Sequence, residues 1–534
     1  MTWLPKATAA SNKSGTIPAP VGGLNASAAL ADMNPTDAIS MRNWWPGPYG
    51  CAVRNGTRQW STGLGYPVNT LVTWSSIAGE TKCFAFSGSS MYDITVRGPI
   101  NVPLLTGLTN SWWQDTQQVN PAGAHLILLN GQDDGILYNE TGLHRLVAGD
   151  GTTAYTWKNI DPAQAIEATV HEVRLWAVQK DTAVGWYLPV GAIFGVFEMF
   201  DFGPLFSKGG YLAQLTTWTV DDGNGAEDHL VAVSSEGEAV VYGGSDPSDI
   251  TTWSLVGVYN VGAPVSGRRS YAKVGGDLVF LTQRGLISTA AMLVSTKVKD
   301  TPTVKMSKVQ YLVSQATNDR GFLEGWSFKY FPNINMLLIN VPTTVETSNI
   351  QIVANDVVDS QPWTIFDGMP AQCWKLFDSA ILFGDSKGNV WEAWTGYSDE
   401  ALFDGTGGNA ITSTVQQAYS YLDAGPRQKQ VDMFRTNFIT DDSNGIDYAA
   451  LIDYDFSLSN VRVPNAPFAG VPDSLWNIGL WNSAIWQSGD TTQRNEWLQS
   501  YGMGYVVSIA LAMQSTSSVI WLSTDFSYKT GGLL

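Results

Sequence analysis

Cys83-Phe-Ala-Phe-Ser-Gly-Ser-Ser-Met-Tyr-Asp-Ile94 is the stretch of sequence that decides the fold. Two apolar runs flank a Ser-Gly-Ser-Ser turn, and this pattern is typical of a β-hairpin. Six further stretches have the same form, with Gly, Asn or Asp at or next to the bend. The seven bends lie at residues 88, 133, 181, 237, 285, 333 and 388, and their spacings are 45, 48, 56, 48, 48 and 55 residues.

A sustained period of about 50 residues matches a propeller blade of about four strands. One hairpin cannot bury its apolar face alone, so neighbouring hairpins must pack around an axis. We therefore predict an all-β protein, with a β-propeller of six to eight blades over residues 61–405. An irregular series of β-sandwich hairpins is the alternative interpretation.

The two flanks of the periodic region differ from it. Residues 1–60 are rich in loop formers and indicate an extended N-terminal arm that serves assembly. The period is lost after Gly405-Thr-Gly-Gly408, and longer alternating runs such as Tyr505–Leu511 follow. These runs predict a C-terminal antiparallel, sandwich-like β-domain over residues 406–534.

One apolar insertion, at about residues 183–212, interrupts the periodic region. It favours burial between blades or at a subunit interface over a membrane-active segment. Its longest apolar run, Val190–Phe200, contains Glu198 and is too short to cross a bilayer, so we expect no membrane span. The opening residues Met1–Lys6 lack the apolar core of a signal peptide.

Composition narrows the function classes. The 534 residues carry a net charge of −18, and charged residues make up 15% against about 25% in an average soluble chain. Without a run of basic residues, we expect no tight or sequence-specific binding of nucleic acid, although an acidic wall that DNA passes is compatible with this charge. Cys51, Cys83 and Cys373 are odd in number and widely spaced, which favours free thiols and folding in a reducing cytosol.

The sequence has few residues in the patterns that catalytic or metal-binding sites need. His125, His144, His171 and His229 show no metal-ligand spacing, and we expect them to be hydrogen-bonded structural residues. The sequence has no CxxC, GxSxG, P-loop or GxGxxG in a suitable context. We therefore predict no catalytic residues, no cofactor and no enzyme activity.

Two weaker candidates remain. An oxygen-rich loop could hold Ca²⁺, although its spacing is not that of an EF-hand and a surface turn is the favoured interpretation. Its candidate ligands are Asp221, Asp222, Asn224, Glu227 and Asp228. The stretch Ser245–Trp253 approaches the sialidase turn pattern once, without its Gly and out of register, which argues against a sialidase.

Several tryptophans could form carbohydrate platforms, but packing at sheet or subunit contacts is the favoured interpretation. They are Trp44, Trp45, Trp112, Trp113, Trp476, Trp481 and Trp486.

Ordered blocks at both ends of the chain resemble the tail nozzle (tail hub, or tail tubular protein B-like) proteins of short-tailed bacteriophages. The opening blocks are Pro18-Ala-Pro-Val-Gly-Gly-Leu-Asn25, Leu30–Ala38 and Asn43-Trp-Trp-Pro46. Internal blocks are Tyr187–Ile193, Tyr242–Leu286 and Trp363–Trp391. The closing blocks are Trp476–Trp486, Tyr501-Gly-Met-Gly504, Trp521–Tyr528 and Gly531–Leu534. Asn34 and Trp45 depart from the usual Pro and Phe of the family.

This resemblance implies a structural virion protein without catalytic residues. It implies a homohexamer around a channel, located below the portal and the adaptor (head-to-tail connector) protein. This hexamer would close the channel until genome ejection and would carry tail fibres or spikes. DNA would be a partner only in transit, and the protein would be located in the virion tail after assembly in the host bacterial cytoplasm. Two alternatives stay open: a tailspike-type propeller glycan hydrolase or lyase, and a non-catalytic sugar-binding adhesin.

Overall fold

The computed structural model describes residues 12–221, 226–293, 304–345, 349–422, 425, 427–440, 446–456, 463–464, 492–494 and 496–531. This part of the chain is all-β, as the sequence predicts. Its helical elements are short, and none has the length and hydropathy needed to cross a lipid bilayer. They are η1 (Pro162–Gln164), η2 (Gly203–Leu205), α1 (Thr289–Leu293) and α2 (Gln310–Arg320).

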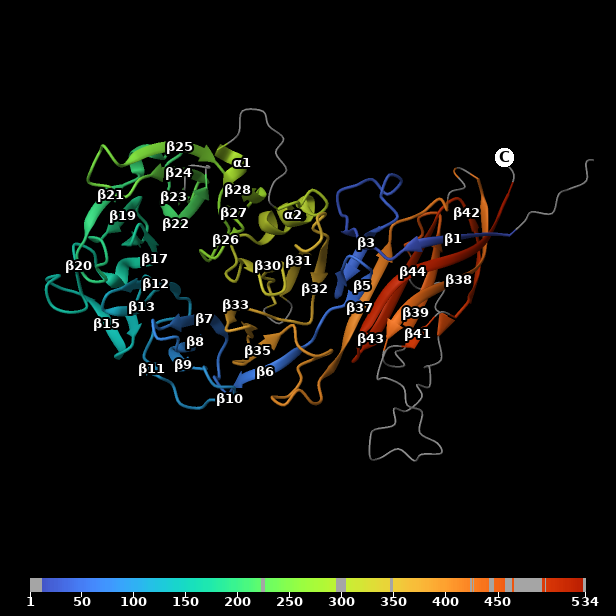
Figure 1. The fold of residues 1–534 in the computed structure, drawn as a ribbon, viewed down its shortest axis with the longest axis horizontal. Coiled ribbons are helices and arrows are strands. Elements are labelled where there is room, and N and C mark those ends of the chain that lie inside the picture. Colours follow the sequence, from blue (N-terminus) through green and yellow to red (C-terminus); the bar gives the residue numbers. More distant parts are fainter. Residues whose placement is uncertain are drawn as a thin grey trace, which may run out of the picture.

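Five sheets made of strands close together in sequence follow one another around a ring, which occupies the left of Figure 1. The first contains β7 (Val68–Ser75), β8 (Thr81–Ser87), β9 (Ser90–Asp93) and β11 (Leu105–Thr106). The second contains β12 (Gln114–Asn120), β13 (Gly123–Leu129), β14 (Gly135–Asn139), β15 (Gly142–Ala148), β16 (Thr156–Lys158) and β20 (Gly195–Val196).

The next three sheets continue the ring in the same order as the sequence. The third contains β17 (Ala165–His171), β18 (Arg174–Gln179), β19 (Val184–Tyr187) and β21 (Glu198–Asp201). The fourth contains β22 (Leu212–Asp221), β23 (Ala226–Ser234), β24 (Glu238–Gly243) and β25 (Ser254–Asn260). The fifth contains β26 (Tyr271–Val274), β27 (Asp277–Thr282) and β28 (Gly285–Ser288).

All seven predicted hairpins are present as antiparallel pairs. In the first of them Phe86 lies opposite Met91 across the turn at Gly88, whose φ of 56° favours glycine. The alternating apolar residues of each hairpin fill clusters between adjoining sheets, such as the one that holds Trp176, Leu215 and Val240. The sequence pattern therefore predicted the propeller arrangement from its local unit.

The first strands of successive sheets lie side by side around an axis. β7 contacts β12, β12 contacts β17, β17 contacts β22, and β22 contacts β27 of the fifth sheet. The circle is completed by β26, β29 (Ser327–Phe331) and β33 (Cys373–Phe377), because β26 contacts β29, β29 contacts β33, and β33 contacts β7 again. One end of the axis is therefore lined by the beginnings of these strands and the other end by their later residues.

A strand from near the N-terminus takes part in closing the ring. β6 (Thr57–Thr62) pairs antiparallel with β35 (Val390–Ala393), which continues through β34 (Ala380–Gly384) to β33; β10 (Gly98–Pro99) flanks β6. Arg58 on β6 and Glu392 on β35 form an ion pair at 2.7 Å, and Arg97 contacts the same carboxylate. Residues about 330 positions apart are thus neighbours in one sheet.

Two large sheets reach from the ring to the right of Figure 1, where their remaining strands form a second body. The seven-stranded sheet contains β1 (Lys13–Pro18), β4 (Trp44–Pro46), β5 (Cys51–Val53), β38 (Lys429–Thr440), β41 (Thr492–Arg494), β42 (Leu498–Gly504) and β44 (Val519–Thr530). The eleven-stranded sheet contains β29, β30 (Met336–Val341), β31 (Ile350–Asn355), β32 (Trp363–Phe366), β3 (Asp37–Arg42), β37 (Asn409–Gln417), β43 (Val507–Ser515), β39 (Ile446–Ile452), β40 (Val463–Pro464), β2 (Gly23–Leu24) and β36 (Ser398–Asp399).

This body contains strands from both ends of the chain. β1 pairs with β44 over six residues, from Lys13 opposite Tyr528 to Pro18 opposite Ser523. The predicted arm thus contributes strands to both large sheets. The eleven-stranded sheet runs from β29 of the ring to β40, across the boundary expected at residue 405, and a separate C-terminal domain stays a prediction.

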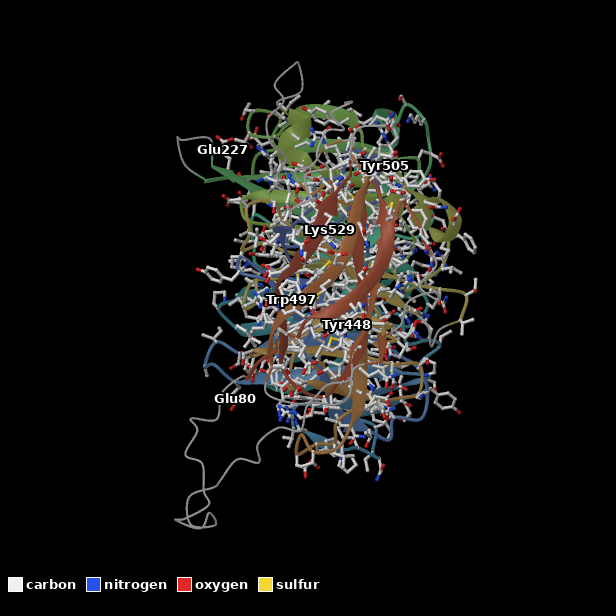
Figure 2. The ribbon with its side chains drawn as sticks, turned by 90° about the vertical axis from the view of Figure 1, so that its right-hand side faces the viewer. Glu80, Glu227, Tyr448, Trp497, Tyr505 and Lys529 are labelled. Carbon is white, nitrogen blue, oxygen red and sulfur yellow. The ribbon has the colours of Figure 1, made fainter. Side chains whose placement is uncertain are left out.

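Buried aromatic residues and one buried ion pair hold this body together. Trp44 and Trp521 are fully buried and pack edge to face at 6.1 Å between ring centres. Arg54, which is 1% exposed, forms a two-pronged ion pair with Asp399 at 2.8 and 2.6 Å and also bonds Asn43. Seen from this end, Trp497, Tyr505 and Lys529 lie on the body (Figure 2).

The apolar stretch at residues 183–212 supplies β19, β20 and β21. Its side chains Leu188, Ile193 and Phe197 pack in the cluster between the second and third sheets, and Phe202 and Phe206 pack between the third and fourth. These contacts agree with burial between sheets. Cys51, Cys83 and Cys373 are buried free thiols, and burial raises the pKa of each well above its ordinary value.

Candidate functional site

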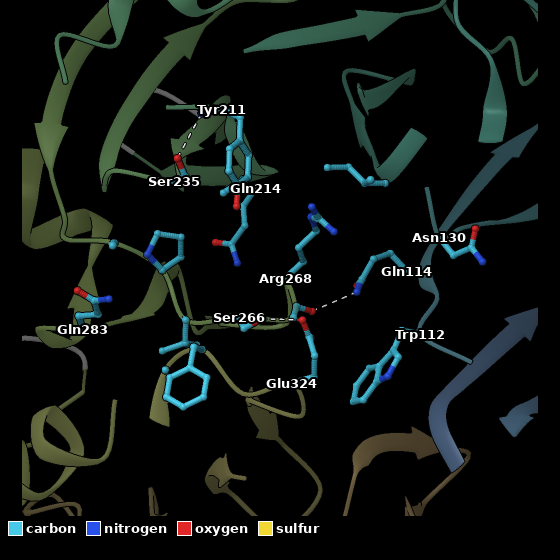
Figure 3. Close-up of a pocket in the computed structure, with 18 of the residues that line it drawn as sticks. Trp112, Gln114, Asn130, Tyr211, Gln214, Ser235, Ser266, Arg268, Gln283 and Glu324 are labelled. Atoms are coloured by element: carbon cyan, nitrogen blue, oxygen red, sulfur yellow. Dashed lines mark hydrogen bonds between the residues drawn. The ribbon is translucent and has the colours of Figure 1, made fainter. Parts of the chain in front are cut away.

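A cavity of about 640 Å³ opens at the end of the ring axis where the first strands begin (Figure 3). Its walls come from residues just before or at the start of β12, β17, β22, β26 and β29, together with turns between the second and third strands. This volume lies within the ~300–1,000 Å³ range of small-molecule sites. The cavity is therefore the principal candidate for a binding site in the described part of the chain.

Amides and aromatic rings dominate the lining. The amide side chains are Asn110, Gln114, Asn130, Gln132, Gln214 and Gln283, and the aromatic ones are Trp112, Tyr211 and Phe322. Hydrogen bonds fix part of this wall: Asn110 donates to Gln132 at 3.0 Å, and Gln114 donates to the Gly267 carbonyl at 3.2 Å. Tyr211 is 40% exposed and Phe322 is 75% exposed, so aromatic surface is open at the cavity.

Two adjacent arginines before β26 have opposite roles. Arg269 reaches across the axis and donates to the Asn69 carbonyl at 2.7 Å, to the Thr70 hydroxyl at 2.7 Å and to the Trp113 carbonyl at 2.8 Å. Arg268 instead extends among the residues that line the cavity (Figure 3). Its Nε is buried without a hydrogen-bond partner, and its guanidinium forms no ion pair with any described residue.

Glu167 on β17 follows the cavity-lining residue Ile166 and is 3% exposed. Its carboxylate accepts hydrogen bonds from the Leu215 amide and the Tyr271 hydroxyl, each at 3.3 Å. Burial raises the pKa of the Glu167 carboxyl from 4.5 to about 8, against the lowering effect of Arg268 and of these two donors. The group is therefore mainly protonated at neutral pH and does not neutralise Arg268.

A layer of charged groups continues along the axis. Asp115 on β12 and Lys375 on β33 form an ion pair at 2.5 Å beside a small cavity of about 110 Å³. Burial would raise the pKa of Asp115, but Lys375, Lys329 and Arg269 together hold it below its ordinary value. Burial, and then the charge of Lys375, lower the pKa of Lys329 to about 8. This ion pair and the further cationic side chains of Lys329 and Arg269 thus line this small cavity.

The predicted calcium ligands are only partly within the described residues. Asp222, Asn224 and the side chain of Asp221 lie outside them, so the weak calcium site stays a prediction. Glu227 and Asp228 lie on β23, where Asp228 accepts a hydrogen bond from Thr219 at 2.5 Å, and Figure 2 shows Glu227 at the margin of the molecule. Among the residues that the structure describes, no three His, Cys, Asp or Glu side chains are grouped to hold a metal ion.

The histidines do not come together in one site. His171 contacts the Thr217 hydroxyl and the Gly244 carbonyl, both at 3.1 Å, and burial lowers its pKa. His125 contacts Asn120 at 3.1 Å, and His144 contacts Thr141 at 2.8 Å. His229 packs beside Trp218. The structure thus agrees with the predicted hydrogen-bonded role for His125, His144 and His171, whereas the buried Nδ1 of His229 has no hydrogen-bond partner among the described residues.

The tryptophans divide between packing and the cavity. Trp44 and Trp113 are fully buried, and Trp45 packs on Trp394 at 4.9 Å. Trp112 lines the cavity and lies under Arg269 at 5.6 Å. Trp476, Trp481 and Trp486 lie outside the described residues.

The stretch Ser245–Trp253 forms the loop between β24 and β25. Trp253 stacks on Tyr242 at 5.1 Å, and Asp246 forms an ion pair with Arg174 at 2.9 Å. Residues of the sialidase-like stretch thus take part in ring packing and in an ion pair.

Sequence reasoning missed the polar core of the ring. Glu167, Arg268 and Glu324 are far apart along the chain, and only the ring topology brings them to one end of the axis. Gly267-Arg268-Arg269 was the available signal, because adjacent arginines before a strand are unusual in so acidic a chain.

No protein-family model matches the chain. No curated protein matches it. Among solved structures, it is similar to a quinoprotein alcohol dehydrogenase-like protein from Bacteroides thetaiotaomicron, with 8% sequence identity and a TM-score of 0.31. That match covers 55% of this chain and 65% of the other, which is less than two thirds of its length.

Proposed function

We propose that this chain is a structural virion protein, the tail nozzle of a short-tailed bacteriophage. The observation that carries the proposal is the meeting of the blocks on which the sequence resemblance rests. The opening block at Pro18 continues from β1, which pairs with β44, the strand that holds the closing block Trp521–Tyr528. Trp44 of another opening block packs on Trp521. Blocks nearly 500 residues apart thus belong to one structural unit.

The finer architecture is part of this proposal. We propose seven blades, which adds β29–β32 and the sheet of β33–β35 with β6 to the five sheets of consecutive strands. The strands of the two large sheets that follow residue 405 would be the predicted C-terminal β-domain, completed by strands of the N-terminal arm. Six such subunits would surround the channel for genome ejection.

The charges support a channel between subunits rather than through a ring. Arg269 bonds residues on the far side of the propeller ring, and the Asp115–Lys375 ion pair joins β12 and β33 inside it. A net charge of −18 would let a polyanion pass a shared wall without binding it. Exposed apolar side chains, such as Tyr49 at 89% and Ile250 at 92%, would be covered by adaptor, fibre or neighbouring subunits.

The alternatives make different demands on the cavity. A glycosidase usually needs two carboxyl groups facing each other across a sugar, and Glu324 is the single carboxylate among the described residues that line the cavity. The sugar-binding alternative is favoured by the amides and aromatic rings of the same wall. Incubation with host surface polysaccharide, followed for new reducing ends, separates cleavage from binding.

Light scattering of the purified chain, alone and with the adaptor ring, tests the proposal. The expected species is a ring with six times the 57.9-kDa chain mass, formed alone or on the adaptor. A monodisperse monomer that never joins the adaptor would contradict it.

A further inference from the structure

The lining of the cavity at the ring end includes a cationic side chain, Arg268, that the proposed assembly role does not use. Arg268 has its Nε buried without a partner, and none of its nitrogen atoms donates a hydrogen bond to a described residue. Its φ of 54° lies in the left-handed region, which is costly for a residue other than glycine. Two unfavourable features at one residue, beside an Arg269 that is fully paired, point to a ligand.

The surroundings leave the charge of Arg268 available. Glu167 is a buried carboxyl close enough for Arg268 to affect its pKa, and burial raises that pKa so that the group is mainly protonated at neutral pH, while Asp115 is paired with Lys375. Glu324 is exposed and accepts a hydrogen bond from Ser266 at 2.6 Å. A planar guanidinium in this position matches a carboxylate, which it can bind through two parallel hydrogen bonds.

The rest of the wall suits hydroxyl groups and the faces of sugar rings. The Oε1 atom of Gln214, a residue 1% exposed, has no hydrogen-bond partner among the described residues, while its Nε2 is held by Ser270. In Figure 3 the side chains of Gln114 and Gln214 flank that of Arg268, and the rings of Trp112 and Tyr211 lie at the periphery. Amides bind hydroxyls, and aromatic faces cover the apolar surface of a pyranose.

We propose that this cavity binds an acidic sugar residue of a glycan, with its carboxylate on Arg268, its hydroxyls on the amides of Gln114 and Gln214, and a ring face against Trp112 or Tyr211. The chemistry requires both a carboxylate and a polyhydroxy ring. On a virion, a glycan of the host surface would supply both.

Isothermal titration calorimetry on the full chain tests this assignment. The probe is an oligogalacturonide, and the matched probe is the same oligosaccharide with its carboxylates methyl-esterified. We expect the acid form to bind at least about tenfold more tightly than the ester, because loss of a charge-assisted pair costs at least that factor. Equal binding of the two forms, or no binding of the acid at millimolar concentration by the folded protein, overturns the proposal.

Variants locate the site. Arg268→Gln should weaken binding of the acid probe by at least about tenfold, Arg268→Lys should have an intermediate effect because it keeps the charge without the fork, and the ester should respond to neither. Arg174→Gln, which removes an ion pair outside the cavity, should bind like the wild type. If Arg268→Gln is misfolded by circular dichroism, Tyr211→Ala tests the same wall at a 40% exposed position and should weaken both probes.

Free galacturonate separates the two sources of such a ligand. Weaker binding of the monosaccharide than of the oligosaccharide supports a glycan. Equal binding assigns the cavity to a free acidic sugar and overturns the glycan assignment. Unchanged binding by Arg268→Gln overturns the site itself.

Discussion

Replacing Glu167 with Gln should stabilise the folded protein above pH 8, and the gain should grow as pH rises from 4.5 to about 8. The Glu167 carboxyl is 3% exposed, and burial raises its pKa from 4.5 to about 8. Between these values the folded chain keeps a proton that the unfolded chain has lost. Since the unfolded state then binds fewer protons, the wild-type free energy of unfolding falls with rising pH across this window and this group adds no slope outside it.

The size of the effect follows from the same shift. A rise from 4.5 to about 8 corresponds to about 5 kcal/mol at ~1.36 kcal/mol per pKa unit, and structural relaxation around the charged form reduces this to roughly 2–5 kcal/mol. The glutamine side chain of the variant has an oxygen to accept from the Leu215 amide and an NH₂ group to donate to the Tyr271 oxygen. The variant therefore loses the proton linkage while keeping the hydrogen bonds.

Urea unfolding at five pH values between 5 and 9 is the assay, with hydrogen exchange of β17 amides to assign the transition to the ring. Glu324→Gln is the matched control, because it makes the same chemical change at an exposed position in the lining of the cavity. The stability difference between Glu167→Gln and the wild type should increase through the window and level off above pH 8. A difference that stays constant from pH 5 to 9, or one that matches Glu324→Gln, would refute the reasoning.

Three further predictions concern the ring and the two-sheet body. Arg269→Gln should lower the free energy of unfolding by about 3 kcal/mol, because three hydrogen bonds across the axis are lost; urea unfolding measures this, and a loss below about 1 kcal/mol would contradict the bridging role. Arg54→Gln should lower the free energy of unfolding by about 3–5 kcal/mol, because it leaves Asp399 buried without its cation. Arg42→Gln, which removes an ion pair whose arginine is 48% exposed, should lower it by under about 1 kcal/mol. Equal losses in the two variants would argue against burial as the cause. Deletion of residues 1–18 should unpair one edge of β44 and make the chain aggregate on concentration, measured by light scattering; a stable, monodisperse truncated chain would show that β1 is dispensable.

The part of the fold that could be predicted is the part encoded locally. Each hairpin has its turn residue and its two apolar runs within about 15 residues, so Gly88 and Gly237 mark their hairpins without knowledge of the rest. The pairing of β6 with β35 has no such local signal. The alternation in β6 fits any sheet edge, and its partner is fixed only when the ring closes.

The cavity could not be predicted for a related reason. Gln114, Gln214 and Arg268 are each ordinary polar residues near the start of a strand, and their meaning comes from the parallel arrangement of first strands around one axis. The raised pKa of Glu167 likewise depends on packing by β22 and β26, which no sequence window contains. A metal or catalytic constellation has typical residue spacings, whereas a wall of amides does not.

The pairing of β6 with β35 also determines when these strands can pair during translation. At roughly 5–20 residues per second, β6 leaves the ribosome about 15–70 s before its partner, since Arg58 and Glu392 are 334 positions apart. The interval between β1 and its partner β44 is longer, because Thr16 donates a hydrogen bond to Asp525, 509 positions away. During this interval both strands present open edges on which nascent chains could pair with one another. Only a chain translated through β44 can form both bodies, so shorter nascent chains would lack the surfaces needed for a larger assembly.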